Sequence, residues 1–285
     1  MVRMSRLRIL VLTLLAMIAF AGNSLLCRAA LQAGRIDAAS FTTIRVVAGA
    51  LALWLIVRLQ RGSAEKAGSW PSAFALFAYA AAFSFAYLTL TAATGALILF
   101  GAVQATMIGF AFWRGDRLGG WQLLGVACAL GGLVGLLLPG LSAPPLHGAG
   151  LMLLAGIAWG AYSLRGKGAG DPLRATAGNF LRAVPFALVL SLAMLPWAHA
   201  DVAGAALAVA SGALTSGIGY AVWYTALRGL KAASAGTVQL SVPPLAAIGG
   251  VALLGEPATL RLLVASVAIL GGIALASAEK RSARA

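Results

Sequence analysis

The segment LLGEPATLRLLVASVAILGGIAL, residues Leu253–Leu275, has a near-copy earlier in the chain, FWRGDRLGGWQLLGVACALGGLVGL, at Phe112–Leu136. In both copies a glycine–acid pair is followed, fifteen residues after the acid, by two adjacent glycines. Asp116 therefore corresponds to Glu256, 140 positions later in a chain of 285 residues. A repeat offset by about half of the chain predicts a molecule built from two similar halves.

The composition indicates that most of this chain is solvated by lipid. Hydrophobic residues make up 61% of it and charged residues only 10%, with a mean hydropathy of +0.94. A soluble domain carries about a quarter charged residues. Cys27, Cys128, His147 and His199 are widely separated. The sequence therefore predicts no disulfide framework, no metal site and no cofactor.

The charge pattern argues against a nucleic-acid partner. The net charge is +14, but the basic residues come in twos and threes between apolar runs rather than in one continuous stripe. This distribution is typical of loops held on the cytoplasmic side of a membrane.

Ten apolar runs alternate with short loops that leave no room for a soluble domain. A helix needs about 20 apolar residues to cross the hydrocarbon core, so these runs predict an all-α integral membrane protein with ten transmembrane helices. The predicted spans are 8–31, 38–59, 71–90, 94–113, 119–138, 148–165, 175–196, 202–226, 232–254 and 260–278.

The orientation follows from the Lys and Arg residues. With a cytoplasmic N-terminus, 16 of the 21 fall on the cytoplasmic side, and only Arg28, Arg35 and Arg261 fall on the other side. This bias predicts that both termini are cytoplasmic and that the 139–148 loop is external.

The N-terminal segment also fits a second interpretation, because residues 1–22 resemble a secretory signal peptide with a basic start and an apolar middle. However, IAFAGNSL at Ile18–Leu25 recurs as IAWGAYSL at Ile157–Leu164, and the later copy cannot be a signal peptide. We therefore expect the first helix to be retained in the fold.

The repeat extends over nearly the whole chain. Further corresponding pairs are Phe20 with Trp159, Ser24 with Ser163, Arg45 with Arg182, Tyr79 with Tyr220, and Phe83 with Tyr224. They predict one five-helix repeat at 1–140 and a second at 141–285. Because five is odd, the second repeat enters the membrane from the opposite side. Such inverted repeats suit alternating access, in which two similar halves exchange conformations around a site at the midplane.

These features resemble the drug/metabolite transporter superfamily, in particular its ten-helix EamA-type exporters. The resemblance rests on the two five-helix halves, the arginine in the second helix of each (Arg45 and Arg182), and the LLGE phrase at Leu253–Glu256. The first copy departs from the pattern, with an aspartate at position 116 and no proline in 94–113. The resemblance implies a small-molecule exporter, typically of amino acids and related metabolites, whose fifth and tenth helices pack outside the cavity.

Aromatic residues are the first candidates for the cargo site. Those that share one face of their helix by spacing are Tyr79, Phe83 and Tyr87, then Trp159 and Tyr162, then Tyr220 and Tyr224. Two interpretations stay open: the rings fill the core or face lipid, or they line a cavity where they stack on apolar groups and attract ammonium groups.

Polar residues inside the spans complete the candidate site. Asn23 and Gln239 are the better cavity candidates, whereas a serine inside a span usually bonds a neighbouring helix. The predicted substrate-binding set is Phe20, Asn23, Ser24, Tyr79, Phe83, Gln104, Trp159, Tyr162, Ser163, Tyr220, Tyr224 and Gln239.

Charged residues leave two questions open. Arg45 and Arg182 lie about a third of the way into their spans, where they either stabilise the structure or bind a substrate carboxylate. No span contains Asp or Glu, although proton-coupled pumps usually rely on such a residue. This predicts transport without obligatory proton exchange. Pro243–Pro244 predicts a kink in the 232–254 helix.

Together these features predict a monomeric, non-enzymatic transporter of the bacterial inner membrane, with a small-molecule substrate. It would export small amphipathic metabolites, most of all amino acids, including aromatic and apolar ones, around an aromatic cavity. The alternative cargo is a phosphorylated sugar or nucleotide sugar, which needs more cavity Lys and Arg than Arg45 and Arg182 provide. A lipid-modifying membrane enzyme is a weaker alternative, because the acids are scattered singly.

Overall fold

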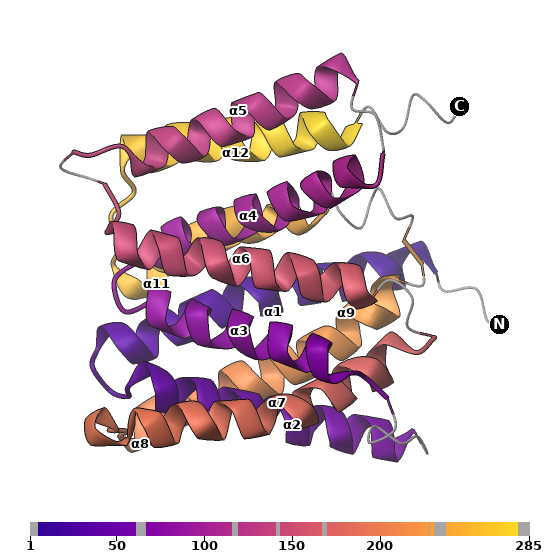
Figure 1. Ribbon diagram of the computed structural model, residues 1–285, viewed down its shortest axis with the longest axis vertical. Helices are drawn as coiled ribbons and strands as arrows, with labels where there is room; N and C mark the ends of the chain where they lie inside the picture. The colour runs from indigo at the N-terminus through magenta and orange to yellow at the C-terminus, as the bar shows by residue number, and fades with distance from the viewer. Residues whose placement is uncertain are drawn as a thin grey trace.

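The computed structural model describes residues 5–60, 67–115, 119–140, 143–166, 170–227, 229–230 and 238–278. These residues form an all-helical bundle, shown in Figure 1. The helices are α1 (Arg6–Gln32), α2 (Ala38–Leu59), α3 (Trp70–Ala86), α4 (Ala92–Trp113), α5 (Gly120–Leu137), α6 (Leu146–Gly166), α7 (Pro172–Ala193), η1 (Leu195–Trp197), α8 (Val202–Ala210), η2 (Ser211–Ile218), α9 (Gly219–Leu227), η3 (Gln239–Ser241), α11 (Val242–Leu254) and α12 (Leu260–Ala278).

The all-helical membrane fold predicted from the sequence is confirmed. The described residues contain ten long helical segments when α8, η2 and α9 are counted as one continuous span. Six of these segments are long and apolar enough to cross a membrane: α1, α2, α4, α5, α7 and the Val202–Leu227 span. Shorter apolar helices of 10–17 residues accompany them, such as Trp70–Ala86.

One predicted helix boundary differs from the structure. The third helix ends at Ala86 rather than at 90, because the chain turns through Tyr87–Leu90 before α4. The expected kink at Pro243–Pro244 stays a prediction: both prolines lie in the first turn of α11, directly after the 3-10 turn Gln239–Ser241, and residues 232–237 of the predicted helix lie outside the described part of the chain. A proline in the first turn removes an amide that has no α-helical partner, so α11 accommodates both prolines.

Side chains that cap the helices explain where many of them begin. The N-cap residues that accept a backbone N–H are Ser5, Asp37, Ser69, Thr91, Asp171 and Asp201. Each satisfies a donor that the first helical turn leaves free. The short polar signals between apolar runs therefore fix the helix starts.

Asp37 also links the connection between α1 and α2 to the connection between η1 and α8. The His199 N–H donates to Asp37 Oδ2 at 2.9 Å, and the Asp37 N–H donates to the His199 carbonyl at 2.9 Å. Partial burial alone would raise the pKa of the Asp37 carboxyl, but hydrogen bonds from Ser40, His199 and Ala39 hold it below its ordinary value. This stabilisation is present at neutral pH and is lost as the pH falls through the lowered pKa.

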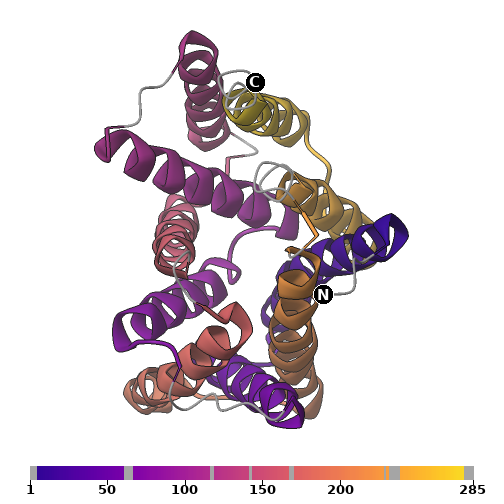
Figure 2. The same ribbon diagram turned by 90° about the vertical axis from the view of Figure 1, so that its right-hand side faces the viewer.

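Eight of the spans close into a ring. Following the packing contacts around it, the order is α4, α6, α3, α7, α2, the α8–η2–α9 span, α1, α11 and back to α4. Seen end-on in Figure 2, α3, α4 and α6 lie on one side, and α1, α9 and α11 lie on the other. Each helix of the ring packs on both sides against helices from the other half of the chain.

Helices α5 and α12 pack against each other outside this ring and touch it through α4 (Figure 1). They are the two copies of the repeated phrase. A Cβ placed on Gly272 would lie 2.5 Å from the Gly125 carbonyl oxygen, and one on Gly132 would lie 2.8 Å from the Ala268 Cβ. The glycines of the repeat therefore let its two copies approach backbone to backbone.

Glu256, the acid of the second copy, links the end of α11 to the start of α4. Gly255 ends α11 with φ +65°, and the turn brings the Glu256 carboxylate to the start of α4. The Ala92 N–H donates to the two carboxylate oxygens of Glu256 at 3.0 and 2.9 Å. Arg28 Nε donates to Glu256 Oε1 at 3.2 Å, and Arg28 Nη1 donates to the Tyr87 carbonyl at 2.9 Å.

This Arg28–Glu256 clasp ties α1, α4 and α11 together at one end of the bundle. Glu256 is only 6% exposed, so the ion pair is largely shielded from water. A carboxylate at the start of a helix is also favoured by the helix dipole. Asp116, the acid of the first copy, lies outside the described residues.

Candidate functional site

A cavity lies inside the ring of eight helices. Its lining comes from α1, α3, α4, α6, the η2–α9 segment and η3, while α5 and α12 contribute nothing to it. The residues that line it are Phe20, Asn23, Ser24, Tyr79, Phe83, Leu99, Phe100, Trp159, Thr215, Ser216, Tyr220 and Gln239. Both halves of the chain therefore contribute to a single cavity.

A continuous row of aromatic rings crosses the cavity from one half to the other. Tyr79 contacts Trp159 with ring centroids 4.8 Å apart, and Trp159 stacks on Tyr220 at 5.5 Å with an interplanar angle of 16°. Tyr220 in turn contacts Phe20 at 5.8 Å. The contacts at the two ends, Tyr79 with Trp159 and Tyr220 with Phe20, correspond to each other in the repeat.

Polar contacts beside these rings also join the two halves. Asn23 Nδ2 donates to the Tyr79 hydroxyl at 3.3 Å. Asn23 Oδ1 accepts hydrogen bonds from the Ser211 hydroxyl at 2.7 Å and from the Thr215 hydroxyl at 3.4 Å. Asn23 thus uses both its amide nitrogen and its oxygen, and the residues it bonds lie in α3 and η2.

The η2 segment gives the cavity wall an unusual backbone. Residues Ser211–Ile218 form a π-helical stretch in the middle of the eighth span. Gly212 lies directly against the Arg45 carbonyl oxygen, so any side chain there would collide with α2. A π-helical turn places its side chains at a different angle from an α-helix and is often found at functional sites. Thr215 and Ser216 reach the cavity from it.

The two repeat-related arginines occupy different environments. Arg45 is 2% exposed, and its Nη2 donates to the Tyr79 hydroxyl at 3.1 Å. Its guanidinium carbon lies 5.2 Å from the centroid of the Tyr79 ring and 4.9 Å from that of Phe83. Arg182 Nη1 instead donates to the Ala67 carbonyl at 2.6 Å and to the Gly178 carbonyl at 3.0 Å. Arg45 therefore adjoins the cavity wall, while Arg182 holds the segment before α3 in place.

Most of the predicted site residues meet in this cavity. Those that line it are Phe20, Asn23, Ser24, Tyr79, Phe83, Trp159, Tyr220 and Gln239. Tyr162 and Tyr224 continue the row of rings beyond it and are bridged by Thr176. The Tyr162 hydroxyl donates to Thr176 Oγ1 at 3.2 Å, and Thr176 donates to the Tyr224 hydroxyl at 3.0 Å.

Two predicted site residues have other surroundings. The Ser163 hydroxyl donates to the Trp159 carbonyl at 2.8 Å, one turn earlier in the same helix. Gln104 lines a second hollow of about 350 Å³, which is mostly apolar and lies between α4 and the α5–α12 pair. Gln104 follows Phe100 by four residues and so lies near the same face of α4, but it is one turn further along the helix, where it lines the second hollow.

Four lining residues were not among the predicted ones: Leu99, Phe100, Thr215 and Ser216. Leu99 and Phe100 lie in a uniformly apolar helix that offers no pattern to single them out. Ser216 is a polar residue inside a span, and both it and Thr215 reach the cavity from the π-helical segment η2, which the sequence did not predict.

The cavity in this conformation is narrow. A water-sized sphere can occupy only about 30 Å³ of it, which is room for roughly two water molecules. Its walls must therefore move apart to admit an amino acid. No group of three or more His, Cys, Asp or Glu residues comes together anywhere in the described part of the chain. The lining offers aromatic faces, hydroxyls and amides, which suit reversible binding.

Comparison with known proteins bears on the family and on the fold. Residues 146–278 match the EamA-like transporter family. Uncharacterized protein PA1977 of Pseudomonas aeruginosa is 60% identical over 256 residues, which cover 90% of this chain and 89% of that protein. A solved structure described only as a crystal structure of a protein has a TM-score of 0.66, with 18% identity, and covers 95% of this chain and 98% of its own. That likeness concerns the fold alone.

Proposed function

This chain belongs to the EamA-like transporter family, and from that premise we propose that it exports small amphipathic metabolites, most of all amino acids, by alternating access. The observation that carries the proposal is the row of rings formed by Tyr79, Trp159, Tyr220 and Phe20 across one cavity. Rings from opposite halves that meet in one cavity move relative to each other whenever the halves do.

The lining suits amphipathic cargo better than a highly charged one. Aromatic faces stack on apolar side chains and attract ammonium groups. Asn23, Ser24 and Gln239 add amide and hydroxyl groups to the lining of the cavity. A phosphorylated sugar needs several cations, whereas the described lining contains no Lys or Arg. Amino acids therefore match this cavity more closely than sugar phosphates do.

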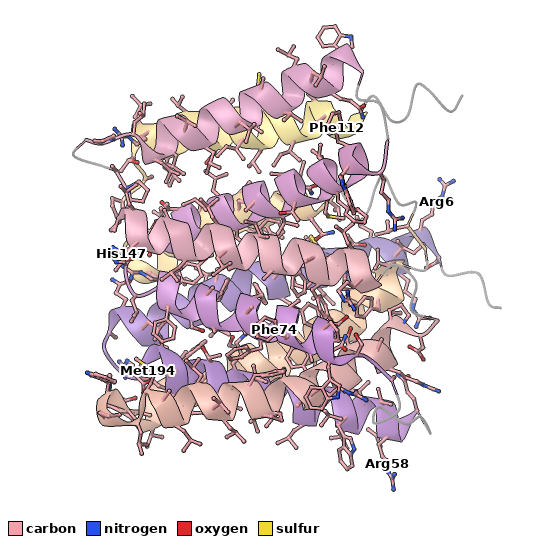
Figure 3. The ribbon with its side chains drawn as sticks, in the orientation of Figure 1. Arg6, Arg58, Phe74, Phe112, His147 and Met194 are labelled. Atoms are coloured by element: carbon pink, nitrogen blue, oxygen red, sulfur yellow. The ribbon has the colours of Figure 1, made fainter. Side chains whose placement is uncertain are left out.

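The distribution of charge supports a cytoplasmic location for the end where α1 begins and α12 ends. Arg6 and Arg58 lie at this end in Figure 3, and His147 and Met194 lie at the opposite one. At the opposite end Arg28 is paired with Glu256 and Arg35 with Asp201. The labelled arginines thus lie at the end where the positive-inside rule expects basic residues. We place the protein in the bacterial inner membrane with both termini inside.

Counterflow into proteoliposomes tests the proposed function. Vesicles that contain the purified protein are loaded with unlabelled L-phenylalanine, L-leucine, L-alanine or glucose 6-phosphate, and entry of the same labelled compound is measured. We expect accelerated exchange of phenylalanine and leucine, relative to vesicles without protein. Exchange of glucose 6-phosphate without exchange of any amino acid would replace our proposal with the sugar-phosphate alternative.

A further inference from the structure

Arg45 is a buried cation beside the cavity, and its position needs an explanation. It is 2% exposed and lies on α2, behind Tyr79 and Phe83. One of its terminal nitrogens, Nη2, donates to Tyr79, while Nη1 is buried with no hydrogen-bond partner. Burying a guanidinium is costly unless it is paired. A buried charge that lowers stability in this way indicates a role in function.

The described part of the chain supplies no counterion for this charge. The described carboxylates, Asp37, Asp171, Asp201 and Glu256, all lie at helix ends or in connections. The ion pairs they form are with Arg28, Arg35 and Arg174. The rings of Tyr79 and Phe83 attract the guanidinium through their faces but do not neutralise it. The wall of the cavity therefore carries one uncompensated positive charge.

A chain of hydrogen bonds links this charge to the cavity. Arg45 has only donors, so the Tyr79 oxygen accepts its hydrogen bond at 3.1 Å. The same oxygen accepts from Asn23 Nδ2 at 3.3 Å, and Asn23 Oδ1 is occupied by the hydroxyls of Ser211 and Thr215. Two donors thus point at the Tyr79 oxygen. Among the described residues no acceptor is bonded to its hydrogen.

We propose that the Tyr79 hydroxyl, polarised by Arg45, donates a hydrogen bond to a carboxylate of the cargo, so that Arg45 is a positioning residue for anion recognition. This inference rests on the proposed function and narrows its substrate class to molecules that carry a carboxylate. A tyrosine oxygen that already accepts from a cation is a stronger donor to an anion. The charge of Arg45 then compensates the carboxylate inside the low-dielectric cavity.

The expected consequence is a preference for carboxylates over otherwise similar amines. A charge-assisted hydrogen bond raises the affinity for a ligand by about tenfold or more. An amine in the same place would meet the positive charge of Arg45 without a partner. Residue Arg182, at the corresponding repeat position, is bonded to carbonyls instead and has no part in this preference.

Binding of three probes that share a phenyl ring tests the inference. They are L-phenylalanine, 3-phenylpropanoate, which lacks the amine, and phenethylamine, which lacks the carboxylate. Affinities are measured by calorimetry on the full-length protein in nanodiscs. We expect the wild type to bind both carboxylates at least about tenfold more tightly than phenethylamine. Arg45→Gln and Tyr79→Phe should each remove most of this preference, and Arg182→Gln should keep it.

Each possible result of these binding measurements either supports or overturns the inference. Tyr79→Phe keeps the ring, so it remains informative if Arg45→Gln does not fold. An unchanged preference in both variants, or equal affinities in the wild type, overturns the inference. Loss of the preference in Arg45→Gln alone shows direct contact with the guanidinium and overturns the role given to the hydroxyl. A carboxylate preference in binding, without exchange of any amino acid in proteoliposomes, overturns the proposed function and leaves the anion site in place. If none of the probes binds, both the inference and the proposed function are overturned.

Discussion

Tyr79 and Trp159 come from different halves of the chain and meet in the cavity with ring centroids 4.8 Å apart. We expect Tyr79→Ala or Trp159→Ala to weaken transport of phenylalanine and leucine more than that of alanine. A lost stacking partner costs about 1 kcal/mol, or roughly fivefold in affinity. Exchange rates of the three amino acids in proteoliposomes, taken as ratios, measure this change in selectivity.

Trp121 offers the matched control for this prediction. It is 62% exposed and lies at the start of α5, outside the ring of helices. Trp121→Ala should change expression or membrane anchoring and leave the ratios between amino acids as they are. If Tyr79→Ala and Trp159→Ala both fold and keep the wild-type ratios, the rings serve packing and the cargo site lies elsewhere.

Arg28 and Arg35 test what burial adds to an ion pair. Arg28 is paired with the buried Glu256, while the side chains of Arg35 and Asp201 are 45% and 53% exposed. We expect Arg28→Ala to lower the free energy of unfolding by about 3 kcal/mol, because it leaves a buried carboxylate without its cation. Arg35→Ala should cost under about 1 kcal/mol. Denaturant unfolding of both variants in the same detergent compares them, and equal losses would contradict the importance of burial.

The sequence pointed to most of the side chains in the cavity but not to their connections. Aromatic residues at a spacing of four, inside spans and repeated in both halves, were a usable signal for Tyr79 and Tyr220. Nothing in the sequence distinguished Arg45 from Arg182, because both occupy the same repeat position. Their different roles depend on which side chains neighbouring helices bring to them, and this information lies in tertiary packing.

Helices α5 and α12 provide a direct test of close packing by glycine. Gly272→Ala would place a Cβ 2.5 Å from the Gly125 carbonyl oxygen and 2.7 Å from the Ala129 nitrogen. Backbone atoms cannot yield as a flexible side chain can, so we expect a loss of about 1–3 kcal/mol. A Cβ on the adjacent Gly271 meets no atom within 4 Å. Gly271→Ala is therefore the control and should be neutral or slightly stabilising.

Thermal unfolding of the two variants in detergent measures the difference between them. A lower transition temperature for Gly272→Ala alone supports backbone contact between α5 and α12. Similar transition temperatures for both variants would mean that the pair separates easily and that the repeated glycines have another role.

The helices were largely predictable because their lengths are set by the bilayer. The predicted 38–59 and 260–278 spans have the bounds observed for α2 and α12. The π-helical segment Ser211–Ile218 could not be predicted, because its composition also fits an ordinary helix. The predicted 232–254 span agrees with the observed end of α11 at Leu254, while its first residues lie outside the described part of the chain.

The orientation of the whole molecule can be tested by cysteine labelling. In a background with Cys27 and Cys128 replaced by alanine, His147→Cys should react with a membrane-impermeant thiol reagent added to intact cells. Arg58→Cys, at the opposite end in Figure 3, should react only after permeabilisation. The reverse pattern would contradict the orientation drawn from the Lys and Arg residues.

The energy source for transport is a property of the complete cavity. The residues that line it include no Asp, Glu or His among those described, and proton-coupled transporters usually rely on such a group. We expect substrate movement down its own gradient, without obligatory proton exchange. Labelled phenylalanine uptake is followed in sealed proteoliposomes with and without an imposed pH gradient. Accumulation above the external concentration, driven by the pH gradient alone, would show that this expectation is wrong.

The overall arrangement was only partly readable from the sequence. The repeat predicted which helices correspond, and the family resemblance implied that the fifth and tenth helices, α5 and α12, lie outside the cavity. It did not predict the order of helices around the ring, because a pattern along the chain contains no record of which helices pack together. The contacts α3 with α6 and α1 with α9, which correspond in the repeat, became visible only in the folded molecule.

The alternation of halves around the ring has a consequence for biosynthesis. Each ring helix packs on both sides against helices from the other half, so the helices synthesised first find only smaller contacts among themselves, such as that of α2 with α3. They stay loosely associated in the bilayer until α11 has been synthesised and closes the ring against α4. A nascent chain of this design stays exposed to membrane proteases and quality control for most of its synthesis, and its lifetime depends on how quickly its last quarter is translated.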